Sequence, residues 1–258
     1  MSKKPFYSMV GIVHYQDKLK KKEERLIVNE FPLTIYLNKD EIITLLCTGD
    51  YLEYLALGFL SNEGLILSKD GIKEITIDKN AIFIETKEDI LKGWTKRRSI
   101  TSGCGKGGSF YDVLEEFDSK KIESNLVISP IEILYLMDKL EERSILYKET
   151  HGVHNSALCT TSDIIVFHQD IGRHNTIDKI SGQCLLENID KNDKLVVTSG
   201  RISSEIVIKL GKMNISILVS MAAPTDLAVS IAEKINLTLI ANVRGRGMEV
   251  YTHPFRIQ

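Results

Sequence analysis

The sequence lacks long apolar runs, and its charges almost cancel. No window of the 258 residues approaches the roughly 18 apolar residues of a membrane span, and residues 1–25 contain no apolar stretch of signal-peptide length. We therefore expect a cytoplasmic protein that does not enter a membrane. Because 33 basic residues face 35 acidic ones, no overall field attracts nucleic acid, and any anion site must be local.

The sequence also lacks paired cysteines. Its four cysteines form no C-x-x-C motif and are Cys47, Cys104, Cys159 and Cys184. This spacing indicates neither a disulfide framework nor a zinc knuckle, so reduced thiols are expected. Three of them stand in the apolar runs TLLCT, SALCTT and GQCLL, which predicts that these three side chains are buried.

The first half of the chain is expected to hold an arm and a β-rich lobe. Residues 17–25 are a charge run without an apolar period, which predicts a solvated arm over residues 1–25. The lobe is expected over residues 26–127. Its predicted elements are a hairpin at 26–46 with the turn at 38–40, a helix capped by Asp50 and ended by Gly64, strands at 74–77 and 81–85, and a helix at 109–117.

The second half of the chain alternates between strand and helix patterns. After an amphipathic helix at residues 130–143, we predict strands at 156–160, 164–167, 195–198, 215–219 and 238–243 and helices at 175–187, 203–213 and 225–235. Such alternation is typical of a layered α/β sheet. We therefore expect an α/β core over residues 128–258, with no repeat of solenoid length.

Cys104 stands apart from the other cysteines because its neighbours are glycines and cations. It lies in the segment SITSGCGKGGSF, whose flanking basic residues are Arg97, Arg98 and Lys106. Nearby cations lower the pKa of a thiol and favour the reactive thiolate. The alternative is a small buried cysteine, but a basic, glycine-rich segment offers little apolar surface to bury it. Cys104 is therefore the candidate nucleophile.

Two predicted strands are followed by residues suited to an anion. Arg173 and His174 come after the strand at 164–167, and the turn Ser199, Gly200, Arg201 follows the strand at 195–198. Ligands of layered α/β sheets favour such strand ends, and helix N-termini and arginine both suit phosphate. The alternative is an ordinary helix that Ser203 caps.

The segment NVRGRGMEVYTH directly follows the last predicted strand. It alternates Arg244 and Arg246 with Gly245 and Gly247. Small residues let the backbone approach a ligand closely, while arginine binds phosphate with two hydrogen bonds. The alternative is an exposed basic hairpin turn.

His151 and His154 are three residues apart, but a metal site needs further ligands. The sequence lacks the H-x-E and P-C-x-x-C signature of zinc deaminases. We therefore expect no metal site and assign these histidines structural or ligand-contacting roles.

Seven segments, taken in order, resemble the signature segments of the FdhD family. They are ALGFLSNEG, SGCGKGG, THGVHNSAL, QDIGRHNTIDK, TSGRISSEIV, APTDLAVSIAEK and NVRGRGMEVYTHP. The resemblance implies a homodimer with a cytidine deaminase-like fold, in which a layered mixed sheet carries helices on both faces beside a smaller N-terminal β-rich lobe. It also implies that sulfur passes from a cysteine desulfurase to the molybdenum (or tungsten) bis-guanine-dinucleotide cofactor, which then enters formate dehydrogenase.

The resemblance also implies roles for particular residues. By position, Cys104 resembles the cysteine that bears the persulfide. The segment associated with the dinucleotide part of the cofactor corresponds to Asn242, Val243, Arg244, Gly245, Arg246 and Gly247. To these cofactor-binding candidates we add the strand-end residues Arg173, His174, Ser199, Gly200 and Arg201.

One position departs from the family pattern. The family usually has a second cysteine three positions after the first, where this chain has Gly107. A persulfide needs one sulfur attachment, so a single-cysteine carrier remains chemically feasible. The departure nevertheless favours a rival function, a chaperone that binds the molybdenum cofactor without transferring sulfur. A nucleoside-type hydrolase on the same scaffold is a third reading and predicts stoichiometric zinc.

Overall fold

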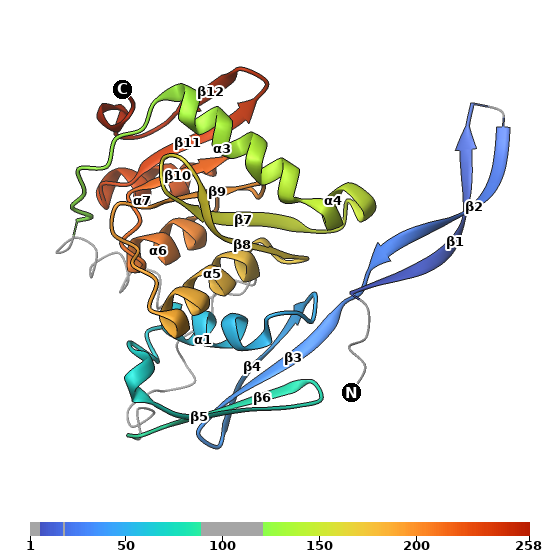
Figure 1. The fold of residues 1–258 in the computed structure, drawn as a ribbon, viewed down its shortest axis with the longest axis horizontal. Helices are drawn as coiled ribbons and strands as arrows, with labels where there is room; N and C mark the ends of the chain where they lie inside the picture. The colour runs from blue at the N-terminus through green and yellow to red at the C-terminus, as the bar shows by residue number, and fades with distance from the viewer. Residues whose placement is uncertain (1–5, 18, 89–120) are drawn as a thin grey trace.

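The computed structural model describes residues 6–17, 19–88 and 121–258. Within these ranges the strands form a two-stranded, a four-stranded and a six-stranded sheet. The two larger sheets and the helices build the body of the molecule, and the two-stranded sheet projects from it (Figure 1). Among the described residues, no helix combines the length and the apolar character needed to cross a membrane.

The six-stranded sheet is mixed and has the order β12-β11-β10-β9-β7-β8. Its strands are β7 (His154–Cys159), β8 (Ile164–Asp170), β9 (Leu195–Thr198), β10 (Ile217–Ser220), β11 (Thr238–Arg244) and β12 (Gly247–Val250). The three strands β9, β10 and β11 are parallel to one another. Antiparallel neighbours flank them on both sides, because β7 pairs with β9 and β12 pairs with β11.

Helices cover both faces of this sheet, as expected from the sequence (Figure 1). One face packs against α3 (Pro130–Arg143). The other packs against α5 (Arg173–Glu187), α6 (Ser204–Lys212) and α7 (Asp226–Lys234). Successive residues of β10 divide between the two cores, since Ile217 and Val219 face the α3 side and Leu218 faces the other. Burial on both faces explains why the central strands read as continuous apolar runs.

The N-terminal lobe is a second layer below α5. Its four-stranded sheet has the order β4-β3-β6-β5, with β3 (Phe31–Leu37), β4 (Asp40–Cys47), β5 (Ile72–Asp78) and β6 (Ala81–Thr86). Helix α1 (Leu52–Asn62) lies between this sheet and α5 (Figure 1). The two helices touch through glycines, since a Cβ on Gly58 would lie 1.7 Å from the carbonyl oxygen of Asp178. Only glycine permits this approach.

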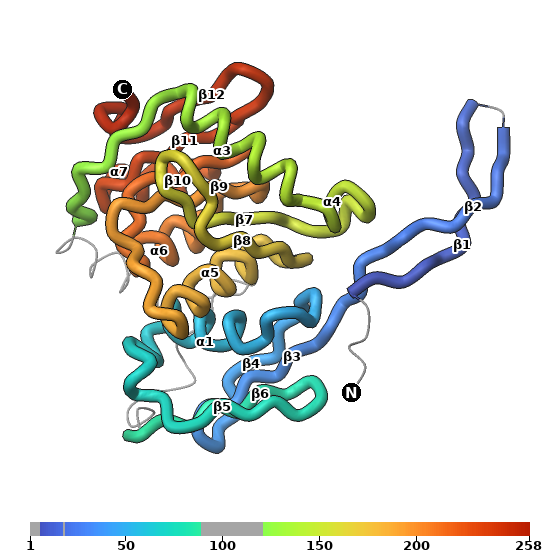
Figure 2. Tube along the Cα trace, in the orientation of Figure 1, coloured from blue at the N-terminus to red at the C-terminus, as the bar shows by residue number. Residues whose placement is uncertain are grey.

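The charged N-terminal segment is a strand. The long hairpin of β1 (Tyr7–Gln16) and β2 (Leu19–Val28) leaves the body as a curved arm (Figure 1 and Figure 2). The charge run at residues 17–25 therefore lies mostly within β2, and β2 crosses the expected limit of the arm at residue 25. The described side chains of the run are mostly exposed, as expected, but from Leu19 onward its backbone is paired with β1. The domain limits at residues 25 and 127 stay predictions.

Most predicted elements are present within one or two residues, and the turn at residues 38–40 joins β3 to β4. Besides β1 and β2, the elements not anticipated are α4 (Ile145–Thr150), β12 and the short 3-10 helices η1 (Lys69–Gly71) and η2 (Pro254–Arg256). The helix predicted at 109–117 lies outside the described residues.

Two predicted helix caps are wrong. Asp50 does not cap α1, whose N-cap residue is Tyr51 in the left-handed region with no side-chain cap. Ser203 stands at the N-cap of α6, but its side chain makes no capping hydrogen bond. In both cases the side chain instead binds α5, through Lys179 and His174 respectively. By contrast, Thr225 does cap α7, because its hydroxyl accepts a hydrogen bond from the N–H of Ala228.

Candidate binding site at the strand-end edge

One edge of the six-stranded sheet gathers the chain segments that were predicted to bind an anion. The carboxyl ends of the parallel strands β9, β10 and β11 meet there. Because β7 runs the opposite way, its first residue, His154, lies at the same edge, opposite Asp170 at the end of β8. Ligand sites of layered α/β folds lie at such edges.

A cavity of about 730 Å³ opens at this edge, between the sheet and the helices α3 and α4. Pockets of roughly 300–1,000 Å³ suit small ligands. The strand ends contribute His154, Asn155, Ser199, Met221, Ala222, Val243, Arg244 and Gly245. The helical wall contributes Leu134, Met137, Asp138, Leu140, Glu141, Ser144, Tyr147, His151, Gly152 and Val153.

Four of the predicted site residues line this cavity, namely Ser199, Val243, Arg244 and Gly245. Ser199 is held in place by Asn155, whose N–H donates to the Ser199 hydroxyl at 3.0 Å and whose carbonyl accepts from the Ser199 N–H at 2.9 Å. The structure therefore brings together the turn after β9 and the turn after β11, which are more than forty residues apart in the sequence.

Arg173, Gly200 and Arg201 lie beside the cavity, around His154. A Cβ on Gly200 would lie 3.0 Å from Cβ of Arg173 and 3.7 Å from Nδ1 of His154. Burial lowers the pKa of His154, and the charges of Arg173 and Arg201 lower it further. The imidazole is therefore held in its neutral form among cations, which suits a site that binds an anion.

The remaining predicted residues lie away from the cavity. Arg246 and Gly247 are exposed in the β11–β12 turn, where Arg244 pairs with Gly247 and Gly245 has a φ of 58°. Asn242 folds back onto the hairpin, and its amide donates to Oε2 of Glu249 at 2.6 Å. The segment is thus a basic hairpin turn, the alternative drawn from the sequence, and it also presents Arg244 and Gly245 to the cavity.

His174 does not line this cavity but holds helix α6. Its Nε2 lies 3.2 Å from the hydroxyl of Ser203 and its Nδ1 lies 3.3 Å from Oε2 of Glu205. Burial, with smaller effects of Lys209 and Arg173, lowers the pKa of His174 to about 3. A neutral ring that donates to Glu205 and accepts from Ser203 fits these contacts, so His174 positions the neighbouring helix.

Two buried polar atoms at the site have no hydrogen-bond partner within the described part of the chain. They are Oδ1 of Asn155, in a residue that is 2% exposed, and Nε of Arg173. Buried polar groups are normally paired, because each unpaired one costs about 1–3 kcal/mol. An acceptor and a donor left open beside the same cavity are typical of a site that binds a polar ligand.

The N-terminus of α5, which carries Arg173, is anchored by a buried ion pair. Asp170 accepts from the N–H of Gly172 at 3.0 Å and binds Nζ of Lys179 at 2.7 Å. Lys179 also binds Asp50 at 2.5 Å. Burial lowers the pKa of Lys179, but the two carboxylates outweigh that effect and raise it above its ordinary value. The sequence alone predicted neither the buried Lys179 nor this role of Asp50.

Sequence reasoning also missed the helical wall. Asp138 and Glu141 belong to the helix predicted at 130–143, and neither they nor Tyr147 were predicted as site residues. The available signal was weak, because Asp138 and Glu141 stand at a helical spacing that solvated faces commonly show. Among the residues that the structure describes, no three His, Cys, Asp or Glu side chains gather closely enough to hold a metal ion.

The cysteines divide as the sequence predicted, as far as they are described. Cys47, Cys159 and Cys184 are buried. Burial raises the pKa of Cys47 and Cys159 to about 12 and that of Cys184 to about 11. Cys104 lies outside the described residues, and its role stays a prediction.

Comparison with known proteins identifies the family. The model of the FdhD/NarQ family matches residues 28–258. The chain belongs to the FdhD/NarQ family. The resemblance noted from seven short motifs is therefore confirmed over nearly the whole chain.

Curated members of the FdhD/NarQ family are similar along their full length. The sulfur carrier protein FdhD of Bacillus subtilis (strain 168) is 44% identical over 250 residues, which cover 94% of each chain. That of Staphylococcus aureus (strain N315) is 39% identical over 250 residues, covering 95% of this chain and 94% of the relative.

A solved structure shares the fold. A crystal structure described as a formate dehydrogenase accessory protein of Desulfotalea psychrophila superposes with a TM-score of 0.81 at 25% identity. The match covers 98% of this chain and 100% of that one. The mixed α/β architecture is therefore that of an FdhD-type protein.

Proposed function

We propose that this chain is a sulfur carrier for formate dehydrogenase. In this proposal the Cys104 thiolate attacks the terminal sulfur of a cysteine desulfurase persulfide, and the desulfurase cysteine leaves as a thiolate. Cys104 then carries the sulfur to the molybdenum (or tungsten) bis-guanine-dinucleotide cofactor before the cofactor enters formate dehydrogenase. The observation that carries the proposal is the 39–44% identity, over more than nine tenths of the chain, to proteins named sulfur carrier protein FdhD.

The state of the other cysteines supports Cys104 as the carrier. A thiol with a pKa of about 12, as in Cys47 and Cys159, is a thiolate in only about one molecule in 100,000 at pH 7. The pKa of Cys184 is about 11, so its thiolate fraction at pH 7 is also very small. Because the thiolate is the nucleophile, these three residues are unsuited to sulfur transfer, and Cys104 is the cysteine that remains.

The cavity supports the binding of the cofactor's nucleotide part. Arg244 and Gly245 line it beside Ser199, so phosphate oxygens can meet a guanidinium and backbone N–H groups there. On the opposite wall, Asp138 and Glu141 offer carboxylates. Guanine presents adjacent N–H donors on its pairing edge, which a carboxylate can accept. We infer that one guanine nucleotide of the cofactor lies across this cavity.

The proposal also includes the oligomeric state and the compartment of the carrier. A homodimer in the cytoplasm is the form in which we expect the carrier to work, since a free thiol is maintained in a reducing compartment. A cytidine deaminase-like layering is supported by helices on both faces of a mixed sheet.

The test is the intact mass of the protein after incubation with a cysteine desulfurase and cysteine. Wild type gains one sulfur, about 32 Da, that reductant removes, and Cys104→Ala gains none. The matched control is Cys184→Ala, which removes a buried thiol and keeps the adduct. An adduct that persists in Cys104→Ala contradicts the assignment of the carrier.

One observation favours the rival function. Gly107 stands where the family usually has a second cysteine, which suits a chaperone that holds the cofactor without transferring sulfur. A Cys104→Ala variant that binds GDP and still restores formate dehydrogenase activity would establish the chaperone.

A further inference from the structure

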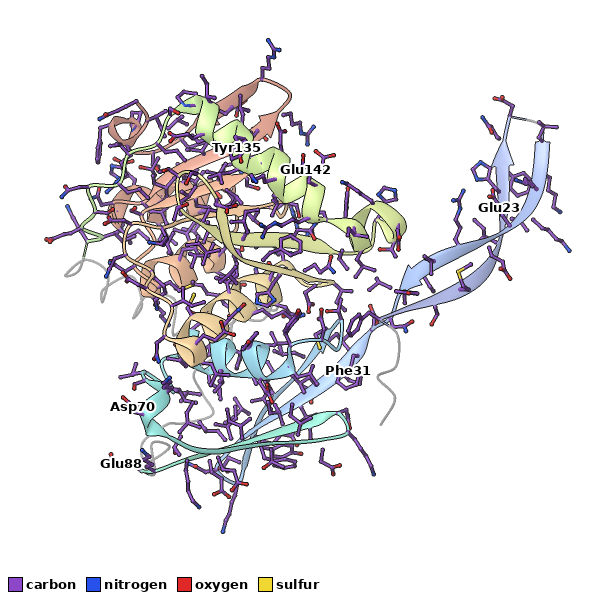
Figure 3. All side chains as sticks on the ribbon, viewed as in Figure 1. Glu23, Phe31, Asp70, Glu88, Tyr135 and Glu142 are labelled. Carbon is purple, nitrogen blue, oxygen red and sulfur yellow. The ribbon has the colours of Figure 1, made fainter. Side chains whose placement is uncertain are left out.

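The arm formed by β1 and β2 carries apolar side chains that the body does not cover. Every residue of β1 except Ile12 is exposed, including Met9 at 55% and Tyr15 at 67%. Figure 3 shows the side chains of its outer half, such as Glu23, well away from the body. Within the described ranges, no other strand pairs with this hairpin. Isolated two-stranded hairpins are marginally stable in water, so this arm gains from a partner.

The two long edges of the arm differ in charge. Residues 20–25 of β2 are all charged. Residues 8–14 of β1 contain no Asp, Glu, Lys or Arg, and His14 is their one titratable side chain. Charged side chains, lysine above all, are the usual protection of an exposed strand edge against pairing with another chain. The edge of β2 is protected in this way and the edge of β1 is not.

The hydrogen-bond pattern shows which residues of β1 are free to pair. The N–H of Asn29 donates to the carbonyl of Phe6 at 2.8 Å, which fixes the residues of β1 that face β2. Because antiparallel pairs alternate between bonded and non-bonded, every second residue after Phe6 faces β2. The residues between them turn their N–H and C=O groups outward, and they are Tyr7, Met9, Gly11, Val13 and Tyr15.

The outward residues of β1 are arranged symmetrically about Gly11. Residues 7–15 read YSMVGIVHY, with Tyr7 and Tyr15 at equal distances from Gly11 and Met9 and Val13 inside them. An antiparallel contact with an identical strand, centred on Gly11, therefore sets apolar residues opposite apolar residues without opposing like charges. Nothing lies within 4 Å of the Cβ position of Gly11, so a second backbone has room to approach.

We propose that β1 pairs with β1 of a second copy of this chain, antiparallel and about a twofold axis at Gly11. The two arms then form a four-stranded sheet in which Met9 lies opposite the partner's Val13 and Tyr7 lies opposite the partner's Tyr15. The contact is isologous, as twofold dimers require. Its two outer edges are the charged β2 strands, which end the sheet.

This inference deepens the homodimer in the proposed function and does not rest on sulfur transfer. The base of the arm lies beside the candidate site, since a Cβ on Gly152, which lines the cavity, would be 2.6 Å from Cγ1 of Val28. Joining two arms would therefore hold two cavities in one assembly.

The test is the dimer dissociation constant of the full chain, measured by sedimentation. Because of the twofold axis, Met9→Lys places a charge opposite an apolar residue at two positions of the dimer. We expect each position to raise the dimer dissociation constant about tenfold, which gives about 100-fold in total. Adding Val13→Glu sets lysine opposite glutamate at both positions and restores the dimer, whereas adding Val13→Lys does not. The matched control is Leu26→Lys, which changes the residue that pairs with Met9 inside the arm and leaves the dimer intact.

Cross-linking locates the axis. In a Cys104→Ser background, oxidation joins two copies of Gly11→Cys, because paired strands bring opposed Cα atoms to about 5.5 Å. Glu24→Cys, at the position opposite Gly11 in the arm, gives no cross-link. A monomeric wild type, a dimer that tolerates Met9→Lys, or failure of Val13→Glu to restore it overturns the proposal. None of these readouts depends on a persulfide, so a missing sulfur adduct counts against the proposed function alone.

Discussion

The polar and charged groups between the two lobes and those at the strand-end edge are held in opposite ways. Between the lobes, Lys179 is fully buried and binds Asp170 at 2.7 Å and Asp50 at 2.5 Å. At the edge, Oδ1 of Asn155 and Nε of Arg173 have no partner within the described ranges. Paired groups secure the position of α5, and unpaired groups can bind a ligand. The same kinds of side chain thus serve stability in one region and function in the other.

The stabilising role of the paired region is tested by removing its cation. Lys179→Met leaves Asp170 and Asp50 buried without a cation, which lowers the free energy of unfolding by about 3–5 kcal/mol. Urea unfolding measures the loss. Lys73→Met removes the exposed ion pair with Glu85 and leaves stability unchanged within error. A loss in Lys179→Met below about 1 kcal/mol would show that the network does not hold the lobes together.

The contact between α1 and α5 is tested by a larger residue at Gly58, which forces the two helices apart. In Gly58→Ala the new methyl group would lie 1.7 Å from the carbonyl oxygen of Asp178, so the helices must separate. We expect a destabilisation of about 3 kcal/mol, measured by thermal and urea unfolding. The control is Gly71→Ala, where nothing lies within 4 Å of the Cβ position. Equal stability of the two variants would contradict the close approach of the helices.

The third prediction concerns His174, which stands between the two regions. Its pKa is lowered from 6.5 to about 3 by burial, so the unfolded chain binds a proton more readily than the folded one. Stability therefore falls as the pH drops below 6.5, and His174 accounts for about 2 kcal/mol between pH 7 and pH 5.

Urea unfolding at the two pH values tests this effect of pH. His174→Gln flattens the pH dependence by that amount. His168→Gln has a similar effect, because burial lowers the pKa of His168 to about 4. An unchanged pH dependence in His174→Gln would mean that the ring is protonated in the folded protein.

At the open edge, we expect the loss of a cavity arginine to weaken ligand binding without affecting stability. Arg244→Ala removes a cavity residue that is exposed, so stability is unchanged while the Kd for GDP rises about tenfold. Calorimetric titration with GDP measures the Kd. Arg246→Ala, from the same turn but away from the cavity, changes the Kd by less. The reverse order of the two variants would place the nucleotide outside the cavity.

Most helices and strands after residue 128 could be predicted because their local signals agree with their packing. The strands of the six-stranded sheet are buried on both faces, so they appear as apolar runs between turn residues, as Leu195–Thr198 does. Strand β2 could not be predicted, since its charged residues show no apolar period. Its structure depends on the backbone partner that β1 supplies.

The errors at the helix caps have a similar cause. Asp50 and Ser203 stand where a cap is expected, and spacing alone makes them candidates. In the folded protein Asp50 binds Lys179, which lies 129 residues away in the sequence, and Ser203 binds His174. A buried charge that needs a counter-ion gains more from Asp50 than an exposed helix end does, so the distant partner prevails.

The sequence by itself determined the family, the alternation of strands and helices, the burial of three cysteines and the basic turns that follow the strands. These features depend on residues close together in the chain. The tertiary structure alone decided that Ser199 and Arg244 share one cavity, that Arg246 and Asn242 lie away from it, and that α3 and α4 form its wall. Those relations depend on strand order and helix packing, which bring together side chains that no local pattern connects.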